Sequence, residues 1–182
     1  VKKLRKITNM EFDVHIMSMN NELFINEMLD IGAESITFHY ESSFHTDRLI
    51  NLVKRSGAKV GVALNPATSL SVLDYILPQC DSILLMLINP GFATDKGEKQ
   101  VSYADKKVKD LSELIRKNNL DVKIQVDGRV SLETIPKLVS AGADSLVVGS
   151  TSLFIPGNTI SENKKLLDIS ISEGLKGGNF NG

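Results

Sequence analysis

The chain of 182 residues, 42 % of them apolar, is long enough for one sizeable hydrophobic core and too short for two ordinary domains. Its 21 basic and 22 acidic side chains nearly cancel, which disfavours nucleic acid or another polyanion as a partner. Cys80 is the single cysteine, so no internal disulfide can form. The sequence contains neither a signal peptide nor an apolar run of about 18 residues, and we therefore expect a cytoplasmic protein without a membrane segment.

The two ends of the chain differ in pattern from the rest. Residues 1–7 form a short basic amphipathic stretch, typical of the end of a helix whose beginning is missing, so we expect an N-terminal truncation. Residues 176–182 contain three glycines and no apolar periodicity, which favours a loose C-terminal tail. Residues 1–175 are therefore expected to form a single domain.

Short apolar runs with few charges recur along the chain, about 20 to 40 residues apart, and each is typical of a strand buried on both faces. Helical patterns with one apolar face separate these runs. The predicted strands are residues 12–17, 35–39, 59–64, 82–88, 122–126 and 145–148. Strand and helix are thus predicted to alternate six times.

A short pattern repeats where predicted helices end and strands begin. It reads Gly32-Ala-Glu-Ser-Ile, Cys80-Asp-Ser-Ile and Gly142-Ala-Asp-Ser-Leu. We expect Gly32 and Gly142 to adopt the left-handed conformation that commonly follows a helix. Repeated strand and helix units with right-handed crossovers predict a parallel sheet, either closed into a barrel or open and doubly wound.

Polar side chains at the ends of the predicted strands favour the barrel. A barrel gathers all these ends at one mouth, whereas an open sheet gathers only those beside its switch point. The residues concerned are His15, His39, Asn65, Asn89, Asp127 and Ser150. Closing an eight-stranded barrel would require roughly 40 more residues. The sequence therefore predicts an α/β chain with six of the eight βα units of a (β/α)8 TIM barrel, lacking the first two strands.

The first predicted strand carries Asp13, His15 and Met17 on one face, toward the interior of such a barrel. His15 could ligate a metal with Asp13 beside it, or the two side chains could simply satisfy each other. His39 could line a substrate pocket or be a satisfied buried histidine. For Met17 and Met86 the alternatives are core packing and an apolar wall beside the substrate.

Three loops carry the remaining candidates. Asp127 ends a strand and precedes glycine, where it could ligate a metal, transfer a proton, or form a turn or helix cap. Gly149 and Ser150 follow the last strand, where barrel enzymes commonly bind phosphate, although a plain tight turn would also explain them. Asn89-Pro-Gly-Phe92 could begin a mobile lid or form a type II turn.

Six blocks, in their order and spacing, resemble the ribulose-phosphate 3-epimerase family over residues 1 to about 155. The blocks are Asp13-Val-His-Ile-Met17, Phe38-His-Tyr-Glu41, Gly61-Val-Ala-Leu-Asn-Pro-Ala-Thr68, Met86-Leu-Ile-Asn-Pro-Gly-Phe92, Val126-Asp-Gly128 and Val148-Gly-Ser150. The resemblance implies a (β/α)8 barrel of the ribulose-phosphate-binding type that binds a divalent metal cation (Zn, Fe, Mn or Co). It also implies an isomerase that inverts the carbon next to the ketone of a sugar phosphate, and a homo-oligomer in the full-length form.

The family's site residues carry over onto matching positions. The resemblance assigns His15 and Asp127 to the metal, so we expect them to meet at the barrel mouth, and it gives Asp127 a second role as acid/base. The other acid/base and two further ligands of the family lie in a His-x-Asp block on the strand before the one that matches Asp13–Met17. This sequence does not contain that earlier strand. Residues expected to contact substrate or its phosphate are Met17, His39, Met86, Gly91, Gly128, Arg129, Gly149 and Ser150.

The expected reaction dictates the chemistry of the site. Inversion beside a carbonyl removes a proton from one face and delivers another to the opposite face, so two acids must flank the substrate. The enediolate formed between these steps carries negative charge that a divalent cation stabilises. No nicotinamide or flavin is required.

Two loops depart from the family pattern. The usual Gly-Phe-Gly-Gly-Gln is Gly91-Phe-Ala-Thr-Asp95, and the usual Asp-Gly-Gly is Asp127-Gly-Arg129. Ser150-Thr-Ser-Leu-Phe154 is closer to the allulose-6-phosphate 3-epimerase branch. Both substrates stay open, with ribulose 5-phosphate, an intermediate of the pentose phosphate pathway, slightly ahead.

Two other functional classes are alternatives to the epimerase. A decarboxylase or aldolase barrel would carry Asp-x-Lys-x-x-Asp on an interior strand, and no predicted strand does. A non-catalytic barrel that keeps only its phosphate site is a further alternative. With two strands missing, the sheet would keep two unpaired edges and lack half of its metal ligands, so we expect the 182-residue chain itself to be inactive.

Overall fold

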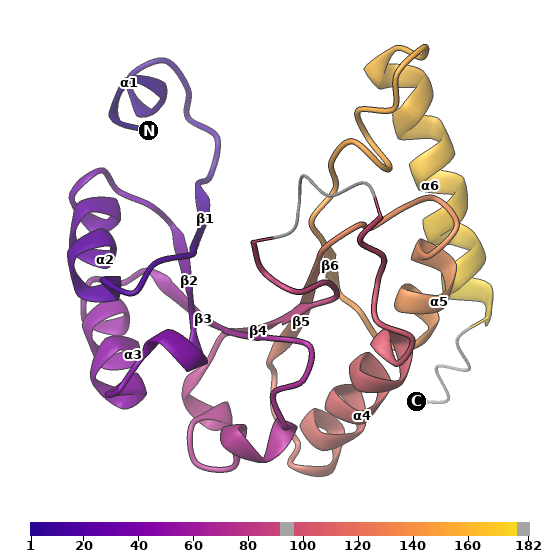
Figure 1. Cartoon of the computed structure of the whole chain (residues 1–182). Helices are drawn as coiled ribbons and strands as arrows, with labels where there is room; N and C mark the ends of the chain where they lie inside the picture. The colour runs from indigo at the N-terminus through magenta and orange to yellow at the C-terminus, as the bar shows by residue number, and fades with distance from the viewer. Residues whose placement is uncertain (92–96, 178–182) are drawn as a thin grey trace. The chain divides into compact units, whose positions relative to one another are not determined.

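The strands of the protein follow one another in the sheet in chain order, β1-β2-β3-β4-β5-β6 (Figure 1). The computed structural model describes residues 1–91 and 97–177. The strands are β1 (Asp13–Ile16), β2 (Ser35–His39), β3 (Lys59–Leu64), β4 (Ser82–Met86), β5 (Lys123–Asp127) and β6 (Ser145–Leu146). β1 pairs with β2, β2 with β3 and β5 with β6, each in parallel. All six expected strands are therefore confirmed, and β1, β4 and β6 are each two residues shorter than expected.

The helices follow the strands as predicted, with one exception. The α-helices are α1 (Lys2–Arg5), α2 (Asn21–Asp30), α3 (Thr46–Arg55), α4 (Ala104–Lys117), α5 (Ile135–Ser140) and α6 (Ile160–Gly177). Helix α6 thus includes the first two residues of the expected tail, and residues 178–182 lie outside the described part of the chain. No described helix combines the length and apolar character needed to cross a membrane.

The exception is the connection after β3, where an α-helix was expected. Two short 3₁₀-helices occupy it instead, η2 (Leu70–Leu73) and η3 (Leu77–Gln79). Pro66 and Pro78 each remove a backbone donor that a continuous helix would need, and Ser69 caps the first turn by accepting a hydrogen bond from the backbone of Ser71. The prediction of an α-helix in this connection was therefore wrong.

The chain divides into two compact units, the first made of residues 1–64 and 68–84. Its core surrounds β2 and β3, of which all residues except Ser35 and Lys59 are buried. α2 packs on β1 and β2, α3 packs on β3, and the two helices contact each other (Figure 1). A third short helix, η1 (Tyr40–Ser42), turns the chain directly after β2.

The second unit consists of residues 65–67 and 85–182. α4 packs on β5, and α5 packs on both α4 and α6. The contact between α5 and α6 is close because Gly174 has no side chain: a Cβ there would lie 2.7 Å from the Cβ of Val139 and 2.8 Å from the carbonyl oxygen of Pro136. β4 begins in the first unit and ends in the second.

The repeated sequence pattern has a structural function. The acidic residue in each copy accepts a hydrogen bond from a backbone N–H at the start of an earlier strand or just before it. The pairs are Glu34 with Phe12 (2.7 Å), Asp81 with Val60 (2.8 Å) and Asp144 with Ile124 (2.8 Å). Gly32 and Gly142 have φ of +72° and +111°, which confirms the left-handed conformation expected for them. Each copy therefore ends a helix and helps to fix the register of a strand.

Candidate functional site

Two of the predicted site residues meet in the first unit. His15 on β1 and His39 at the end of β2 lie with their Nε2 atoms 2.9 Å apart, which is a hydrogen-bond distance. The ring centroids are 5.0 Å apart and the ring planes are inclined by 21°. At that centroid distance, with two nitrogens in contact, the rings meet edge to edge rather than face to face. β1 and β2 are parallel neighbours in register, and this pairing brings the two histidines together.

His39 continues into a hydrogen-bonded chain. It is 7 % exposed, and its Nδ1 lies 3.3 Å from Oε2 of Glu41. The other carboxylate oxygen of Glu41 accepts a hydrogen bond from the hydroxyl of Thr68. Glu41 and Thr68 had no role in the sequence-based prediction, although both stand in the blocks that carry the resemblance. The feature of the sequence that could have indicated Glu41 is a carboxylate two residues after a histidine at a strand end.

The turn after β2 fixes the position of Glu41. The carbonyl oxygen of His39 accepts hydrogen bonds from the hydroxyls of Ser42 (3.1 Å) and Ser43 (3.0 Å). The side-chain amide of Asn21, which is 4 % exposed on α2, donates to the carbonyl oxygen of Ser42 at 3.0 Å. These contacts hold η1 in the tight turn that directs Glu41 back to the histidine.

The two methionines predicted near the substrate differ in burial. Met17 follows β1 and is 60 % exposed, so it does not belong to the buried core. Met86 ends β4 and is 4 % exposed. Met86 is therefore buried and Met17 accessible, and a substrate contact for either side chain stays a prediction.

The turn after β5 positions Asp127 in the second unit. The carbonyl oxygen of Asp127 accepts a hydrogen bond of 2.7 Å from the backbone N–H of Leu87. Gly128 and Arg129 follow with φ of +115° and +50°. The side-chain amide of Gln100 donates to the carbonyl oxygens of both, at 2.9 and 3.0 Å. Gln100 thus clamps the turn, a role that the sequence did not reveal because it lies 28 residues away from the nearer carbonyl.

The loop after β6 lies against the loop after β5. The hydroxyl of Thr151 donates to the carbonyl oxygen of Val130 at 2.7 Å and links the two loops. The backbone N–H of Gly149 donates to the hydroxyl of Ser152 at 3.3 Å, so a phosphate would have to compete with that hydroxyl for this donor. The structure therefore brings together both loops that were predicted to bind phosphate.

The predicted lid is described only in its first part. Gly91 has a φ of +93°, and the backbone N–H of Asn89 donates to the side-chain carboxylate of Glu98 at 3.2 Å. Residues 92–96, which include Phe92 and the departure from the family lid pattern, lie outside the described residues.

The residues expected to bind a metal do not make up a complete set of ligands. Within residues 1–91 and 97–177, no group of three or more His, Cys, Asp or Glu side chains could hold an ion. His15 belongs to the first unit and Asp127 to the second, so their expected meeting stays a prediction. The described chain supplies one imidazole and one carboxylate of the assigned types, and a closed coordination shell would need further donors.

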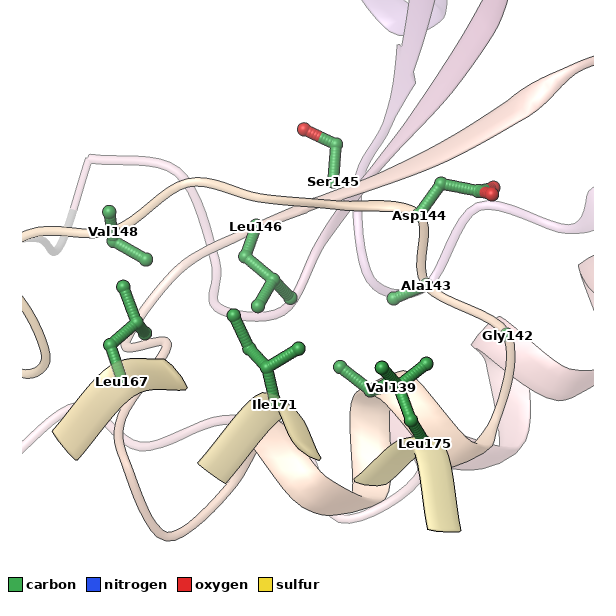
Figure 2. Close-up of a pocket in the computed structure, with 10 residues that line it drawn as sticks. All are labelled: Val139, Gly142, Ala143, Asp144, Ser145, Leu146, Val148, Leu167, Ile171 and Leu175. Atoms are coloured by element: carbon green, nitrogen blue, oxygen red, sulfur yellow. The ribbon is translucent and has the colours of Figure 1, made fainter. Parts of the chain in front are cut away.

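A cavity of 540 Å³ lies in the second unit between β6 and α6 (Figure 2). Leu146 and Val148 face Leu167 and Ile171 of α6 across it, whereas Ser145 points away. Its lining includes none of the residues predicted to bind substrate or metal. The cavity is therefore an apolar space between a strand and its covering helix and not part of the candidate site.

Solved structures of similar fold include two enzymes that act on other substrates. A 3-hexulose-6-phosphate synthase from Salmonella typhimurium matches with a TM-score of 0.65 and 19 % identity, covering 94 % of this chain and 79 % of that one. An orotidine 5'-phosphate decarboxylase from Pyrococcus horikoshii matches with a TM-score of 0.59 and 14 % identity, covering 94 % and 78 % of the two chains. At such identities the similarity shows the fold alone, and it confirms the predicted barrel class.

Sequence relatives identify the family. The model of the ribulose-phosphate 3 epimerase family matches residues 1–154. The ribulose-phosphate 3-epimerase of Methanocaldococcus jannaschii is 42 % identical over 149 residues, which cover 82 % of this chain and 62 % of the relative. That of Escherichia coli (strain K12) is 37 % identical over 161 residues, covering 88 % of this chain and 68 % of the relative. On this evidence, the chain belongs to the ribulose-phosphate 3-epimerase family.

Proposed function

We propose that this protein interconverts ribulose 5-phosphate and xylulose 5-phosphate by inverting carbon 3. The observation that carries the proposal is the family match over residues 1–154, which includes both His15 and Asp127. The curated relatives with 42 % and 37 % identity are both named ribulose-phosphate 3-epimerase. The chain spans 62 % of the length of the first of these relatives, so the activity is proposed for the whole protein.

Asp127 is proposed as one of the two acids. In this reaction a carboxylate removes the proton from carbon 3, and the electrons of the C–H bond move onto the ketone oxygen to give an enediolate. A second acid then returns a proton to carbon 3 from the opposite face. The clamp formed by Leu87 and Gln100 on the backbone of residues 127–129 supports this role, because a proton-transfer group must be held in one position.

The resemblance also assigns a divalent cation, which would supply positive charge beside the enediolate oxygens. We propose that His15 and Asp127 are two of its ligands. The other two ligands and the second acid would come from a His-x-Asp block on a strand, and none of the described strands carries one. Residues 1–91 and 97–177 contain no group of three or more candidate ligands, so a complete site would need donors beyond this described part.

The phosphate is proposed to bind at the paired loops after β5 and β6. Backbone N–H groups of residues 128–129 and 149–150 are the candidate donors. The link between Thr151 and Val130 supports this assignment because it holds the two loops in one fixed arrangement. Binding energy gained at the phosphate can then be used to orient the reacting carbon.

The test is an epimerase assay on the completed chain, defined as this chain joined to the residues that precede the matching segment in the M. jannaschii relative. Asp127→Asn is expected to lower kcat by about 10² to 10⁴ fold, with a smaller change in KM. Asp121→Asn is the matched control, because Asp121 precedes the same strand and its side chain is 91 % exposed. A loss below about threefold in Asp127→Asn would exclude an acid/base role for this residue.

Allulose 6-phosphate is the second candidate substrate. The observation that favours it is Ser150-Thr-Ser-Leu-Phe154, which is closer to the allulose-phosphate branch. The same completed chain should be assayed with both sugar phosphates. A kcat/KM for allulose 6-phosphate that exceeds the value for ribulose 5-phosphate would transfer the proposal to the hexulose.

A further inference from the structure

Two aromatic side chains of the first unit are almost completely exposed to solvent. Phe44, in the turn before α3, is 96 % exposed, and Tyr75, between η2 and η3, is 92 % exposed. Among residues 1–91 and 97–177, no other large apolar side chain is more than 79 % exposed. Burial of an aromatic ring against another surface is strongly favourable. The two rings therefore indicate a surface that is suited to contact with another molecule.

The two rings line the same pocket. Its volume is 620 Å³, and Tyr40, Val72 and Ile76 of the first unit also line it. Ile76 is 6 % exposed, whereas Tyr40 and Val72 are half-buried. We refer to these five residues as the aromatic surface. It combines exposed rings with a hollow large enough to accept a ring from another molecule.

Hydrogen bonds hold the backbone beside both rings. Directly after Phe44, the carbonyl oxygen of His45 accepts a hydrogen bond of 3.1 Å from the backbone N–H of Arg48, where α3 begins. The carbonyl oxygen of Tyr75 accepts a hydrogen bond of 3.3 Å from the side-chain amide of Gln79. A surface that is ordered before contact loses little conformational entropy when it binds.

The area of the aromatic surface is comparable with what a small dimer interface needs. An aromatic side chain can bury about 150 to 250 Å², so Phe44 and Tyr75 of one copy offer about 300 to 400 Å². In a dimer, the rings of both copies would bury about 600 to 800 Å². Tyr40, Val72 and the polar edge of the pocket need to add the rest of the roughly 1,200 Å² at which specific interfaces begin.

The charges beside the aromatic surface favour a second copy over a strongly charged partner. Asp47 and Arg48 line the same pocket, and Arg48 also forms an ion pair of 2.7 Å with Glu22. The surface thus carries no large charge of either sign, and two copies of it would not repel each other. A twofold axis requires each copy to present both partners of every contact, and this surface presents both a ring and a hollow.

We infer that the aromatic surface is a contact between two copies of this chain that are related by a twofold axis. Phe44 of each copy enters the hollow of the other and packs against Tyr75 there. The contact uses neither β1 nor β6, the edge strands among the described residues. The inference goes beyond the proposed function and does not depend on it.

Sedimentation velocity of the 182-residue chain, between about 1 and about 100 μM, tests the inference. The expected result is a reversible equilibrium of monomer and dimer with a micromolar dissociation constant. Phe44→Glu should raise this constant by at least about 100-fold, because the substitution occurs twice in a twofold interface. Phe154→Glu is the matched control. Phe154 is 54 % exposed in the second unit, and the dissociation constant of this variant should stay within about twofold of wild type.

A mixing experiment identifies the residues that face each other. Tyr75→Arg should also weaken the dimer. When it is mixed with Phe44→Glu, the mixed dimer has one glutamate opposite one arginine and keeps one native contact between Phe44 and Tyr75. The mixed pair should therefore associate at least about tenfold more tightly than Phe44→Glu associates with itself.

Two results would overturn the inference. A chain that stays monomeric at about 100 μM would assign the aromatic surface to a different partner. A dimer that Phe44→Glu leaves unchanged, in a variant with the circular dichroism of the wild type, would place the contact elsewhere, for example at the edge strands. If Phe44→Glu does not fold, Phe44→Ser replaces it, and a weakened dimer is still required. The measurements contain no substrate, so failure of the proposed epimerase activity would leave them unaffected.

Discussion

At the scale of single residues, Gly128 is held in place by packing as well as by its backbone conformation. Its φ is +115°, and a Cβ would lie 2.9 Å from Cγ1 and 3.0 Å from the backbone nitrogen of Ile88. The backbone nitrogen cannot move away as the end of a flexible side chain could. Gly128→Ala is therefore expected to lower the free energy of unfolding by about 2 to 3 kcal/mol, measured by urea denaturation.

Gly149 is the matched control for that substitution. It lies in the other loop predicted to bind phosphate, and a Cβ there would meet no atom within 4 Å. Gly149→Ala should change the free energy of unfolding by less than about 0.5 kcal/mol. Equal losses in the two variants would show that the contact with Ile88 does not limit position 128.

Cys80 makes the stability of the protein sensitive to alkali. The thiol is buried and donates to the carbonyl oxygen of Ile76, and burial raises its pKa from the ordinary 9.0 to about 12. Between these values the unfolded chain loses the thiol proton and the folded chain keeps it, so the free energy of unfolding falls as pH rises. Below the unfolded pKa the thiol is neutral in both states and has no effect.

The free energy of unfolding should depend on pH more steeply in the wild type than in Cys80→Ala. From about pH 8 to about pH 10, the wild-type free energy of unfolding should fall by about 1 kcal/mol more than that of Cys80→Ala. Urea denaturation at both pH values measures the difference. Parallel curves for the two proteins would mean that the thiol ionises equally easily in the folded and unfolded states.

Some site contacts could be predicted from the sequence, and others could not. The sequence placed His15 and His39 at strand ends because burial patterns reveal strands. It did not reveal that their Nε2 atoms meet, since neighbouring strands and their register are tertiary facts. Gln100 was missed for the same reason, because its contacts with the turn after β5 depend on how a long connection folds back.

At the scale of elements, the sequence predicted strands better than connections. Each apolar run became a strand, whereas the segment after β3 folded as two 3₁₀-helices. Apolar runs report burial on both faces, which determines a strand in a parallel sheet. A connection has no such periodic constraint, and the two prolines at 66 and 78 determined its form.

The contact between α5 and α6 gives an element-scale prediction. Alanine is favoured over glycine inside a helix by about 1 kcal/mol, but overpacking a close contact costs about 1 to 3 kcal/mol. At Gly174 the added Cβ would lie 2.8 Å from the carbonyl oxygen of Pro136, so the steric cost should exceed the gain. Gly174→Ala is expected to lower the free energy of unfolding by about 1 kcal/mol, measured from the shift in the midpoint of urea unfolding.

The same helix supplies the control. A Cβ at Gly177 would meet its nearest neighbour, the Cβ of Ser140, at 3.9 Å, which is an ordinary contact. Gly177→Ala should therefore be neutral or slightly stabilising, within about 0.5 kcal/mol. A stabilised Gly174→Ala variant would show that α6 moves away from α5 at little cost.

At the scale of the whole molecule, the chain corresponds to only part of the length of the relatives it matches. The family model matches residues 1–154, while the chain covers 62 % of the M. jannaschii relative. The fold class could be predicted because it depends on strands and helices that alternate along this chain. The full set of candidate catalytic residues was not, because no described strand carries the His-x-Asp block that the resemblance calls for.

Epimerase activity requires both acids of the proposed mechanism. Proton inversion needs an acid on each face of the substrate, and Asp127 is proposed to supply one of them. One acid can exchange a proton on its own face but cannot deliver one to the other face. The purified 182-residue chain should therefore show no epimerase activity, measured as formation of xylulose 5-phosphate from ribulose 5-phosphate. The completed chain should restore it, and activity in the chain alone would contradict the assignment of the second acid.

A control separates lost chemistry from lost structure. The completed chain can carry a single substitution of the aspartate in its His-x-Asp block, which removes the second acid while the strand remains. If this variant folds and is as inactive as the 182-residue chain, the missing acid explains the inactivity. If it keeps its activity, the upstream strands act by completing the sheet, whose edge strands among the described residues are β1 and β6.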